Sequence, residues 1–171
     1  IPCHVVDVGT GSGAIAITLA TELSLIEVTA VDLSTAALEV ARKNAIGHEV
    51  NDRIEFIEQD LLEGASDTKF DIVVSNPPYV TSEEYEALSR NVREYEPKLA
   101  LESGSTGMEC YQRLVPQAAA RLNDGGWLVL ETSPMLMEQL KTLVSETGFG
   151  EIATVADLAG HQRILTARIH S

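Results

Sequence analysis

Short apolar runs alternate with amphipathic segments along most of the chain. Apolar runs of four to eight residues are typical of buried strands, and apolar residues spaced three or four apart are typical of helices. The pattern predicts strands at residues 3–8, 28–31, 54–57, 70–75 and 127–131, then an adjacent pair at 151–155 and 163–169. It predicts helices at residues 14–23, 35–45, 108–122 and 134–147. Strands that alternate with helices imply a doubly wound α/β sheet.

A long polar connection is expected between residues 81 and 107, because this stretch is acidic and interrupted by proline. Connections of this length are usually lids, binding loops or disordered segments. Gly125 and Gly126 are expected to separate the helix before them from the strand after them. No internal repeat or low-complexity linker divides the chain, so residues 1–171 are expected to form a single domain.

A glycine-rich turn joins the first strand to the first helix. It reads Asp7-Val8-Gly9-Thr10-Gly11-Ser12-Gly13. Because glycine has no Cβ, the backbone can turn tightly and a ligand can approach it, and the following helix offers free N–H groups. The turn therefore predicts a nucleotide site. The spacing Gly9-x-Gly11-x-x-Ala14 also satisfies the dinucleotide fingerprint, so the turn alone leaves the cofactor open.

Two acidic residues follow the next two strands. Asp32 stands 19 residues beyond Gly13, close to the offset of about 20 at which an acidic side chain meets a ribose diol. Alternatively, Asp32 with Ser34 only caps the next helix. Asp60 would face the ligand crevice and could accept from the exocyclic amine of adenine, while Leu61 covers the ring. The alternative for Asp60 is a solvated loop acid.

The stretch Asn76-Pro77-Pro78-Tyr79 directly follows the fourth strand. Its prolines fix their own φ angles and push the residue before each out of the helical region. The Asn76 side-chain oxygen and the Pro77 carbonyl could accept both hydrogens of a planar NH2 group, while Tyr79 packs against its face. The alternative is a stiff loop that only ends the strand.

Composition excludes several classes of protein. The formal net charge of −14, from 12 basic and 26 acidic residues, argues against a broad grip on a phosphate backbone. No apolar run approaches the roughly 20 residues that span a bilayer, and no signal-peptide pattern opens the chain, so a cytoplasmic location or an organellar matrix is expected. Cys3 and Cys110 are isolated, which favours neither a metal site nor a disulfide framework.

Four motifs together carry a family resemblance: Asp7-x-Gly9-Thr10-Gly11-Ser12-Gly13, Asp32-Leu33-Ser34, Asn76-Pro77-Pro78-Tyr79 and Val92-Arg93-x-Tyr95-Glu96-Pro97. They resemble the protein-(glutamine-N5) methyltransferases that act on peptide-chain release factors, the HemK family. The resemblance covers essentially the whole chain. The Asn-Pro-Pro-Tyr motif is shared with amino-methylating DNA enzymes, so it is specific to the chemistry more than to the substrate, and the Val-Arg-x-Tyr-Glu-Pro segment is the narrower signal.

The resemblance implies a fold and a site. The expected fold is the seven-stranded, doubly wound, Rossmann-like fold of S-adenosylmethionine-dependent methyltransferases, mostly parallel with an antiparallel C-terminal strand. It implies that the cofactor is bound through Asp7, Gly9, Thr10, Gly11, Ser12, Gly13, Asp32, Leu33, Asp60, Leu61 and Asn76. It assigns the target glutamine amide to Asn76, Pro77, Pro78 and Tyr79, with Asn76, Pro77 and Tyr79 as the catalytic group. No metal is implied.

The chain departs from the family pattern in two places. Many relatives have Glu-His-Gly after the fifth strand, where this chain has Glu131-Thr132-Ser133. Relatives also carry an N-terminal helical domain that helps to grip the release factor, and the chain is interpreted as a fragment without it. The expected partner is therefore a release factor, with neither stable nucleic-acid binding nor a membrane.

Other functions stay open at this point. One is N-methylation of another target, such as a ribosomal-protein glutamine or adenine N6 in DNA, although the chain lacks a basic, aromatic segment for reading bases. A nicotinamide-dependent oxidoreductase would use Gly9-x-Gly11-x-x-Ala14 but leaves the Asn-Pro-Pro-Tyr motif without a purpose. A non-catalytic cofactor-binding module that needs a partner chain is the third.

Overall fold

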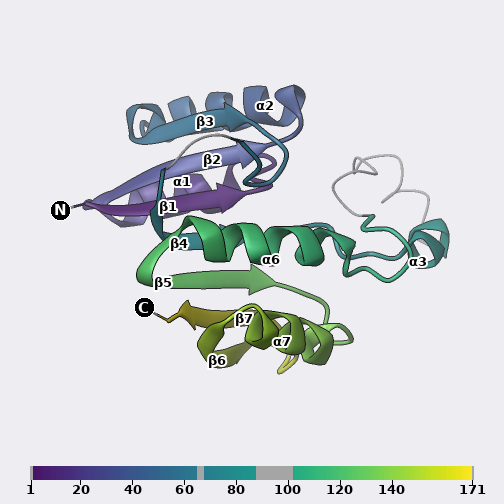
Figure 1. Cartoon of the computed structure of the whole chain (residues 1–171). Helices are drawn as coiled ribbons and strands as arrows, with labels where there is room; N and C mark the ends of the chain where they lie inside the picture. Colours follow the sequence, from purple (N-terminus) through teal and green to yellow (C-terminus); the bar gives the residue numbers. More distant parts are fainter. Residues whose placement is uncertain (1, 65–67, 88–101, 171) are drawn as a thin grey trace.

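The computed structural model describes residues 2–64, 68–87 and 102–170. Within these ranges, seven strands form one sheet in the order β3-β2-β1-β4-β5-β7-β6 (Figure 1). They are β1 (Cys3–Val8), β2 (Ile26–Asp32), β3 (Ile54–Glu58), β4 (Phe70–Ser75), β5 (Leu122–Glu131), β6 (Phe149–Ala156) and β7 (Gln162–Ile169). Strands β1 to β5 pair in parallel, whereas β7 is antiparallel to both β5 and β6. The predicted sheet is confirmed.

Helices cover both faces of this sheet. The α-helices are α1 (Ala14–Glu22), α2 (Thr35–Gly47), α3 (Ser82–Ala87), α6 (Glu109–Arg121) and α7 (Met137–Glu146), and a 3-10 turn, η1, spans Asn51–Arg53. Figure 1 shows α6 in front of the sheet and α1 behind it. The α3 helix lies apart from both layers, at the end of the sheet toward which β4 and β5 point.

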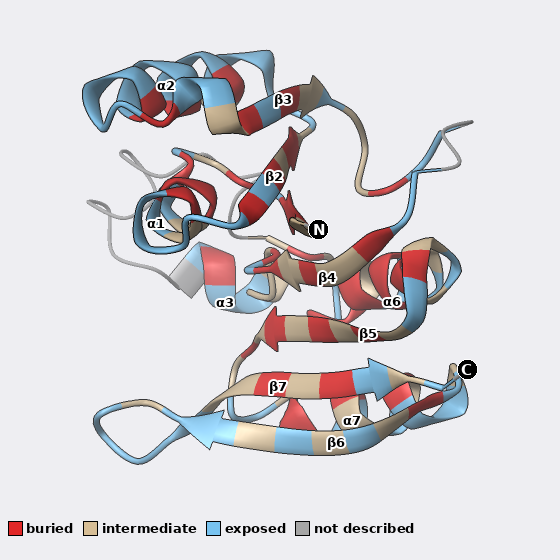
Figure 2. Cartoon of the chain, turned by 90° about the vertical axis from the view of Figure 1, so that its left-hand side faces the viewer, coloured by how far each residue is buried: buried red, intermediate tan, exposed pale blue. Residues whose placement is uncertain are grey.

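Side chains of the central strands point alternately to the two faces of the sheet, and so divide the core into two apolar clusters. In β1, Val5 packs with α1 and α2, whereas Val6 and Val8 pack with α6 and α7. Because side chains alternate across a strand, one apolar run supplies both faces. The buried positions concentrate in β1 and in the inward sides of the helices, while β6 is largely exposed at the sheet edge (Figure 2). The ends of the central strands are therefore held rigidly from both sides.

Two elements differ from the sequence prediction. The expected polar connection begins with α3, whose Tyr85 is buried, so an acidic segment still contributes an apolar contact. The glycines at 125 and 126 do not separate α6 from β5, because β5 already begins at Leu122. A Cβ at Gly126 would lie 3.0 Å from the Asp71 carbonyl oxygen, so this glycine permits close backbone approach inside the sheet.

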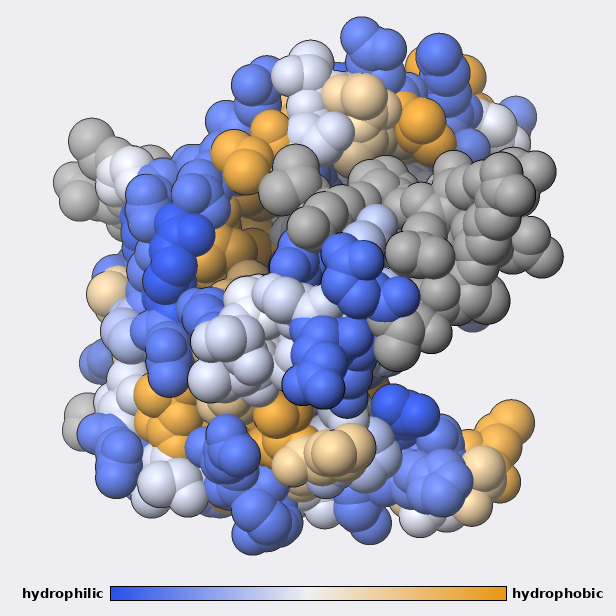
Figure 3. All heavy atoms as spheres, turned by 90° about the vertical axis from the view of Figure 1, so that its right-hand side faces the viewer, coloured by the Kyte–Doolittle hydropathy of each residue, from blue (hydrophilic) through white to orange (hydrophobic). Residues whose placement is uncertain are grey.

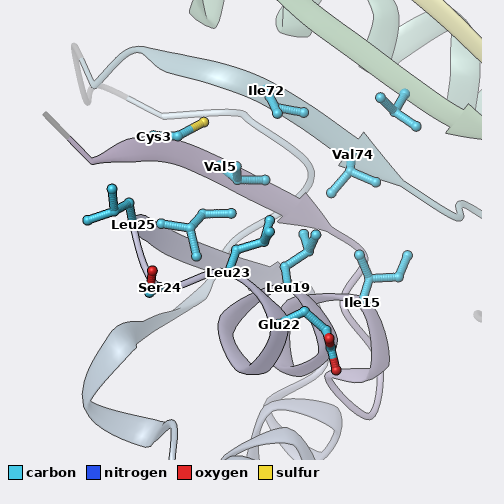
Figure 4. A pocket seen from close by; sticks show the side chains of 12 residues that line it. Cys3, Val5, Ile15, Leu19, Glu22, Leu23, Ser24, Leu25, Ile72 and Val74 are labelled. Atoms are coloured by element: carbon cyan, nitrogen blue, oxygen red, sulfur yellow. The ribbon is translucent and has the colours of Figure 1, made fainter.

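An apolar groove of about 510 Å³ lies beside α1 on the face formed by β1, β4 and β5 (Figure 4). Figure 4 shows Leu19 and Ile15 of α1 turned toward Ile72 and Val74 of β4. The lining contains one carboxylate, Glu22. Its apolar character does not suit a charged nucleoside, so the polar loops at the strand ends are the better place to look for one.

Candidate functional site

The site is built where β1 and β4 end side by side. In the parallel register Val8 of β1 is paired with Ser75 of β4. The Ser75 Oγ donates a 2.6 Å hydrogen bond to the Val8 carbonyl oxygen. β1 pairs with β2 on one side and with β4 on the other, so the strand order reverses between β1 and β4. Crevices at such reversal points are the usual ligand sites of open α/β sheets.

The glycine turn after β1 leaves open space above its backbone. Gly9 and Gly11 have φ angles of +71° and +56°, and a Cβ added at either would meet nothing within 4 Å. The N–H groups of Gly9 and Thr10 donate to the Val31 carbonyl at 2.8 and 2.9 Å, which fixes the turn to β2. Gly13 differs, because a Cβ there would lie 2.9 Å from Ile17. The first two glycines thus favour a ligand, and the third serves helix packing.

Asp7 is buried beneath this turn, with 1% of its surface exposed. Its Oδ2 accepts from the Thr10 hydroxyl at 2.6 Å and from the Ala16 backbone N–H at 3.1 Å, whereas its Oδ1 has no partner. Burial raises the pKa of Asp7 to about 6, against the lowering effect of the two hydrogen bonds, and the charge of Asp32 adds to the rise. An unpaired buried carboxylate oxygen can accept a cationic donor.

Asp32, the last residue of β2, contacts the glycine turn directly. Its Oδ2 accepts from the Gly11 N–H at 2.8 Å, and its Oδ1 accepts from the Ser34 N–H at 2.8 Å. The cap of α2 is the Ser34 Oγ, which accepts from the Ala37 N–H at 3.2 Å. Capping therefore falls to Ser34, and Asp32 retains lone pairs for a further donor. The neighbouring Leu33 is exposed.

Asp60 lies beyond the end of β3 and is ion-paired. The Gln59 N–H donates to the Asp32 carbonyl at 3.0 Å, which brings this segment beside the end of β2. Arg113 of α6 lies 2.7 Å from Asp60 Oδ2 and 2.7 Å from Glu63 Oε1. Asp60 is thus oriented by an arginine rather than left in solvent alone. Leu61 is half-buried against the core at a φ of +52°.

The Asn-Pro-Pro-Tyr corner presents its residues to different environments. Asn76 is exposed, Pro77 is buried, and Tyr79 is half-buried against the core cluster of α6 and α7. Burial raises the pKa of Tyr79, the charge of Glu131 adds to this, and the charge of Arg163 opposes it. Since Asn76 directly follows Ser75, its backbone begins one position beyond the hydrogen bond to β1. The backbone at Asn76 therefore starts beside the end of β1, where the glycine turn begins.

A segment that the sequence analysis treated as loop braces this corner. The Ser103 N–H donates to the Val80 carbonyl at 2.9 Å, and the Ser82 N–H donates to the Gly104 carbonyl at 2.7 Å. Gly107 has a φ of +76°, and a Cβ there would lie 2.6 Å from the Tyr79 carbonyl oxygen. Residues 102–109, here named the brace, thus contact the corner through backbone atoms. Backbone contacts of this kind leave little sequence signal apart from the glycines.

Glu109 holds the brace in shape. Its Oε1 accepts from the N–H groups of Ser105 and Thr106 at 2.8 and 2.9 Å. Burial acts to raise the pKa of Glu109, but the hydrogen bonds from Thr106 and Ser105 outweigh it and lower the pKa to about 2. The carboxylate therefore stays ionised at neutral pH and fixes the turn before α6.

The Glu131-Thr132-Ser133 segment joins β5 to the elements around the corner. The Tyr111 hydroxyl donates to the Glu131 carbonyl at 2.6 Å, and the Thr132 N–H donates to the Arg163 carbonyl at 2.8 Å. Tyr111 is completely buried in α6. The sequence does not predict the hydrogen bond of Tyr111 to Glu131, because an aromatic residue on the apolar face of a helix is typical of an ordinary core position.

Parts of the predicted site lie outside the described residues. These include the whole Val92 to Pro97 segment, on which the narrower family resemblance depends. Across residues 2–64, 68–87 and 102–170, no cluster of three or more histidine, cysteine or acidic side chains could hold a metal ion. In the same ranges, no helix is both long and apolar enough to cross a bilayer.

The described site is acidic overall. Asp7 lies one residue before the end of β1, Asp32 ends β2 and Asp60 follows β3, and these strands are neighbours in the sheet. Hydrophilic residues, interspersed with apolar ones, lie on this end of the molecule (Figure 3). The two cations described near the site, Arg113 and Arg163, are already paired with carboxylates. The arrangement favours a positively charged ligand with hydroxyl groups over a polyanion.

The fold places the chain in the class of S-adenosylmethionine-dependent methyltransferase folds. One solved structure, the T. thermophilus 16S rRNA N2 G1207 methyltransferase in complex with AdoMet and guanosine, is similar with a TM-score of 0.70 at 24% identity, over 98% of this chain and 37% of that chain. At this identity the similarity establishes the fold. Residues 2–100, more than half of the chain, match the family described as "Methyltransferase small domain", and the chain belongs to this family.

Curated relatives narrow the comparison. The release factor glutamine methyltransferase of Rhodopirellula baltica is 46% identical over 164 residues, which cover 95% of this chain and 55% of the relative. The protein of the same name from Geobacter sulfurreducens is 41% identical over 165 residues, covering 96% and 57%. The chain thus spans about half the length of these relatives.

Proposed function

We propose that the chain is the catalytic domain of an enzyme that methylates the N5 amide nitrogen of a glutamine in a peptide-chain release factor, with S-adenosylmethionine as the methyl donor. The similarity to the two release factor glutamine methyltransferases supports the reaction class. The observation that carries the choice of cofactor is Asp7, whose carboxylate occupies the start of α1. In translation termination the substrate meets the enzyme in the cytoplasm or an organellar matrix, and no nucleic-acid or membrane partner is proposed.

The residues present fit S-adenosylmethionine. This cofactor is cationic at its sulfonium and its ammonium group, and the buried Asp7 carboxylate supplies a negative charge beneath the open turn at Gly9 and Gly11. Asp32 would accept from the two ribose hydroxyls, with Leu33 beside the sugar. Asp60 would accept from the adenine amine, with Leu61 against the ring. Thr10, Ser12 and Gly13 complete the turn around the methionine part.

The same observation disfavours a dinucleotide. In dinucleotide-binding folds, the first helix offers its free N–H groups to a pyrophosphate. Here the Ala16 N–H already donates to the carboxylate of Asp7, and Asp32 occupies the Gly11 N–H. A pyrophosphate would therefore meet two acidic side chains where it needs donors. A nicotinamide-dependent oxidoreductase is the weaker proposal for this reason.

The main contribution of the protein to this reaction is to orient the substrate amide nitrogen toward the methyl group. An amide nitrogen is a poor nucleophile because its lone pair is delocalised into the carbonyl. The Asn76 side-chain oxygen and the Pro77 carbonyl would accept its two hydrogens, and the ring of Tyr79 would lie against the amide plane. The bound cofactor supplies an activated methyl group. Orientation of this kind can contribute about 7–11 kcal/mol of barrier reduction at its upper range.

The methyl group would pass to the amide nitrogen from the sulfonium of the cofactor, which becomes a neutral thioether, and the proton is released after the new carbon–nitrogen bond begins to form. The nitrogen then carries positive charge, and one of its two hydrogens leaves to give the neutral N-methyl amide. Asn76 and Pro77 accept hydrogen bonds from these hydrogens without needing to ionise. No histidine or lysine stands among the described residues of the Asn-Pro-Pro-Tyr corner, so a late proton transfer to solvent is proposed.

Other amino or amide targets remain chemically compatible with the same corner. Adenine N6 in DNA and a glutamine of a ribosomal protein both present an NH2 group. The net charge of −14 disfavours DNA, because binding a phosphate backbone depends on cationic side chains. The similarity to named release factor enzymes favours the release factor over the ribosomal protein.

Two assays test the choice of cofactor and the choice of substrate separately. Calorimetry should show binding of S-adenosylmethionine and none of NADH at the same concentration. Incubation with a methyl-labelled donor and purified release factors, followed by mass mapping, should then place one methyl group on a glutamine of the Gly-Gly-Gln sequence. Label in DNA or in a ribosomal protein, with none in any release factor, would reject the substrate assignment.

A further inference from the structure

The turn between β6 and β7 holds an apolar side chain in solvent on a rigid base. The Asp157 Oδ1 accepts from the N–H groups of Ala159 and His161, both at 2.9 Å. The Asp157 N–H donates to the His161 carbonyl at 2.8 Å, and the Gly160 N–H donates to the Asp157 carbonyl at 2.9 Å. Four hydrogen bonds therefore fix a turn of five residues.

Leu158 stands at the tip of this turn and is fully exposed. Burial of a leucine side chain lowers the free energy of the system, and nothing in the described part of the fold covers Leu158. The turn does not need it, because every hydrogen bond above is made by Asp157 or by backbone atoms. Because the backbone of the turn is already fixed by hydrogen bonds, little backbone conformational entropy is lost when the Leu158 side chain is buried by a partner.

The turn lies on the same end of the molecule as the Asn-Pro-Pro-Tyr corner. Figure 2 shows the β6–β7 turn and α3 at the end toward which β4 and β5 point. Arg163 links them, because its Nε lies 3.3 Å from Asp157 Oδ2 while its carbonyl accepts from Thr132 after β5. The charge of Arg163 also reaches Tyr79 of the corner. Met135, 80% exposed, follows β5 at this same end.

We infer that Leu158 is a docking contact for the protein that carries the target glutamine, and receives an apolar side chain of that protein outside the methylated residue. The inference rests on the proposed function, because only a macromolecular substrate extends from the corner to this turn. Burial of the Leu158 side chain against such a substrate would remove exposed apolar surface from water at the end of the molecule where the candidate site lies (Figure 2).

The chain offers a matched control. Leu25 is also a leucine, 77% exposed, but it precedes β2 and so lies at the opposite end of the sheet from the corner. Replacement by serine removes a comparable exposed apolar side chain in both variants. A general effect of surface hydrophobicity would appear in both, whereas a substrate contact would appear only in Leu158→Ser.

The experiment compares two substrates and two readouts. For Leu158→Ser, the Kd and the KM for the intact release factor should rise about tenfold, as expected for loss of an apolar interface anchor, with kcat and the cofactor Kd unchanged. Methylation of a short peptide around the target glutamine should proceed at the wild-type rate. Leu25→Ser should match wild type throughout, and equal melting temperatures should confirm that both variants are folded.

Each other outcome decides a different question. Unchanged binding of the intact protein by Leu158→Ser would overturn the docking contact. An equal loss on the short peptide would also overturn it, because the residue would then serve the site itself. If wild type binds a release factor through Leu158 but transfers no methyl group, the docking contact stands and the proposed reaction fails. If wild type binds no release factor at all, the docking contact is overturned.

Discussion

The hydroxyl of Ser75 donates a 2.6 Å hydrogen bond to the carbonyl of Val8, and so ties the last residue of β4 to the last residue of β1. One strand continues into the glycine turn and the other into the Asn-Pro-Pro-Tyr corner. The two halves of the candidate site are therefore joined at their bases by a buried contact, and their separation does not depend on the longer connections.

Ser75→Ala should loosen this junction. The Val8 carbonyl would lose its side-chain partner in a site that water does not reach, so the free energy of unfolding should fall by about 1–3 kcal/mol. Methyl transfer should fall as well, because the corner would no longer be held against the turn. Urea denaturation measures the first effect, and Ser145→Ala on the exposed face of α7 is the control, with a change within about 0.5 kcal/mol. Stability equal to wild type would show that the hydroxyl contributes nothing.

Asn76→Ala should separate catalysis from cofactor binding. Removal of the Asn76 side-chain oxygen leaves the substrate amide group without a fixed orientation in the site, so turnover should fall about 100-fold. The Kd for S-adenosylmethionine should change by less than about threefold. Steady-state kinetics and calorimetry give the two numbers, and Asn51→Ala, exposed in η1, should match wild type in both. Full activity in Asn76→Ala would remove this residue from the mechanism.

Asp7 should make stability depend on pH. Because the pKa of Asp7 is about 6 in the folded chain and roughly 3.9 when unfolded, the folded state holds the proton more tightly. The stabilising effect is complete below the unfolded pKa and is lost as pH rises through about 6, by on the order of 3 kcal/mol. Denaturation of wild type and Asp7→Asn from pH 3 to 7.5 should therefore show a decline specific to wild type.

The same ionisation should act on the cofactor in the opposite sense. A cationic ligand favours the ionised carboxylate, so the affinity of wild type for S-adenosylmethionine should increase as pH rises through about 6. Asp7→Asn should bind more weakly and without this pH dependence. An affinity that is flat across this range in wild type would place the ammonium group of the cofactor elsewhere.

Gly107→Ala should displace the corner through the brace. A Cβ at this position would lie 2.6 Å from the Tyr79 carbonyl and would also strain a backbone with a φ of +76°. The free energy of unfolding should fall by about 1–3 kcal/mol, and turnover should fall more than cofactor affinity. Gly47→Ala is the matched control, because its Cβ would meet nothing within 4 Å, and it should be neutral or stabilising by up to about 1 kcal/mol. If both variants behave alike, the brace does not position Tyr79.

The sequence was sufficient where the signal is local. The β1 strand, the glycine turn and the cap at Ser34 each depend on residues close together in the chain, and the structure has all three. The directions of the strands were also predictable, since helices between strands require parallel pairing and the last two apolar runs have no helix between them. The roles of the site residues are still predictions.

The missed features depend on contacts between distant segments. Arg113 pairs with Asp60 across 53 residues, and Tyr111 reaches the carbonyl of Glu131 from the buried face of α6. An arginine or a tyrosine in the sequence does not indicate which distant residue it will contact. The brace is harder still, because its contacts with Val80 and Tyr79 involve backbone atoms, which every residue has. In the sequence, only Gly104 and Gly107 mark it, and both have a φ of +76° in the structure.

The position of β7 has a consequence for synthesis of the chain on the ribosome. β7 lies between β5 and β6 although it is made after both, so neither of these strands has its neighbour on that side until residue 169 has emerged. Until then the edge of β5 carries unpaired N–H and C=O groups beside a half-built core, a state open to association with other nascent chains. Translation that stops within the β6–β7 turn should therefore yield an aggregating product, whereas a chain that includes β7 pairs the free edges of β5 and β6.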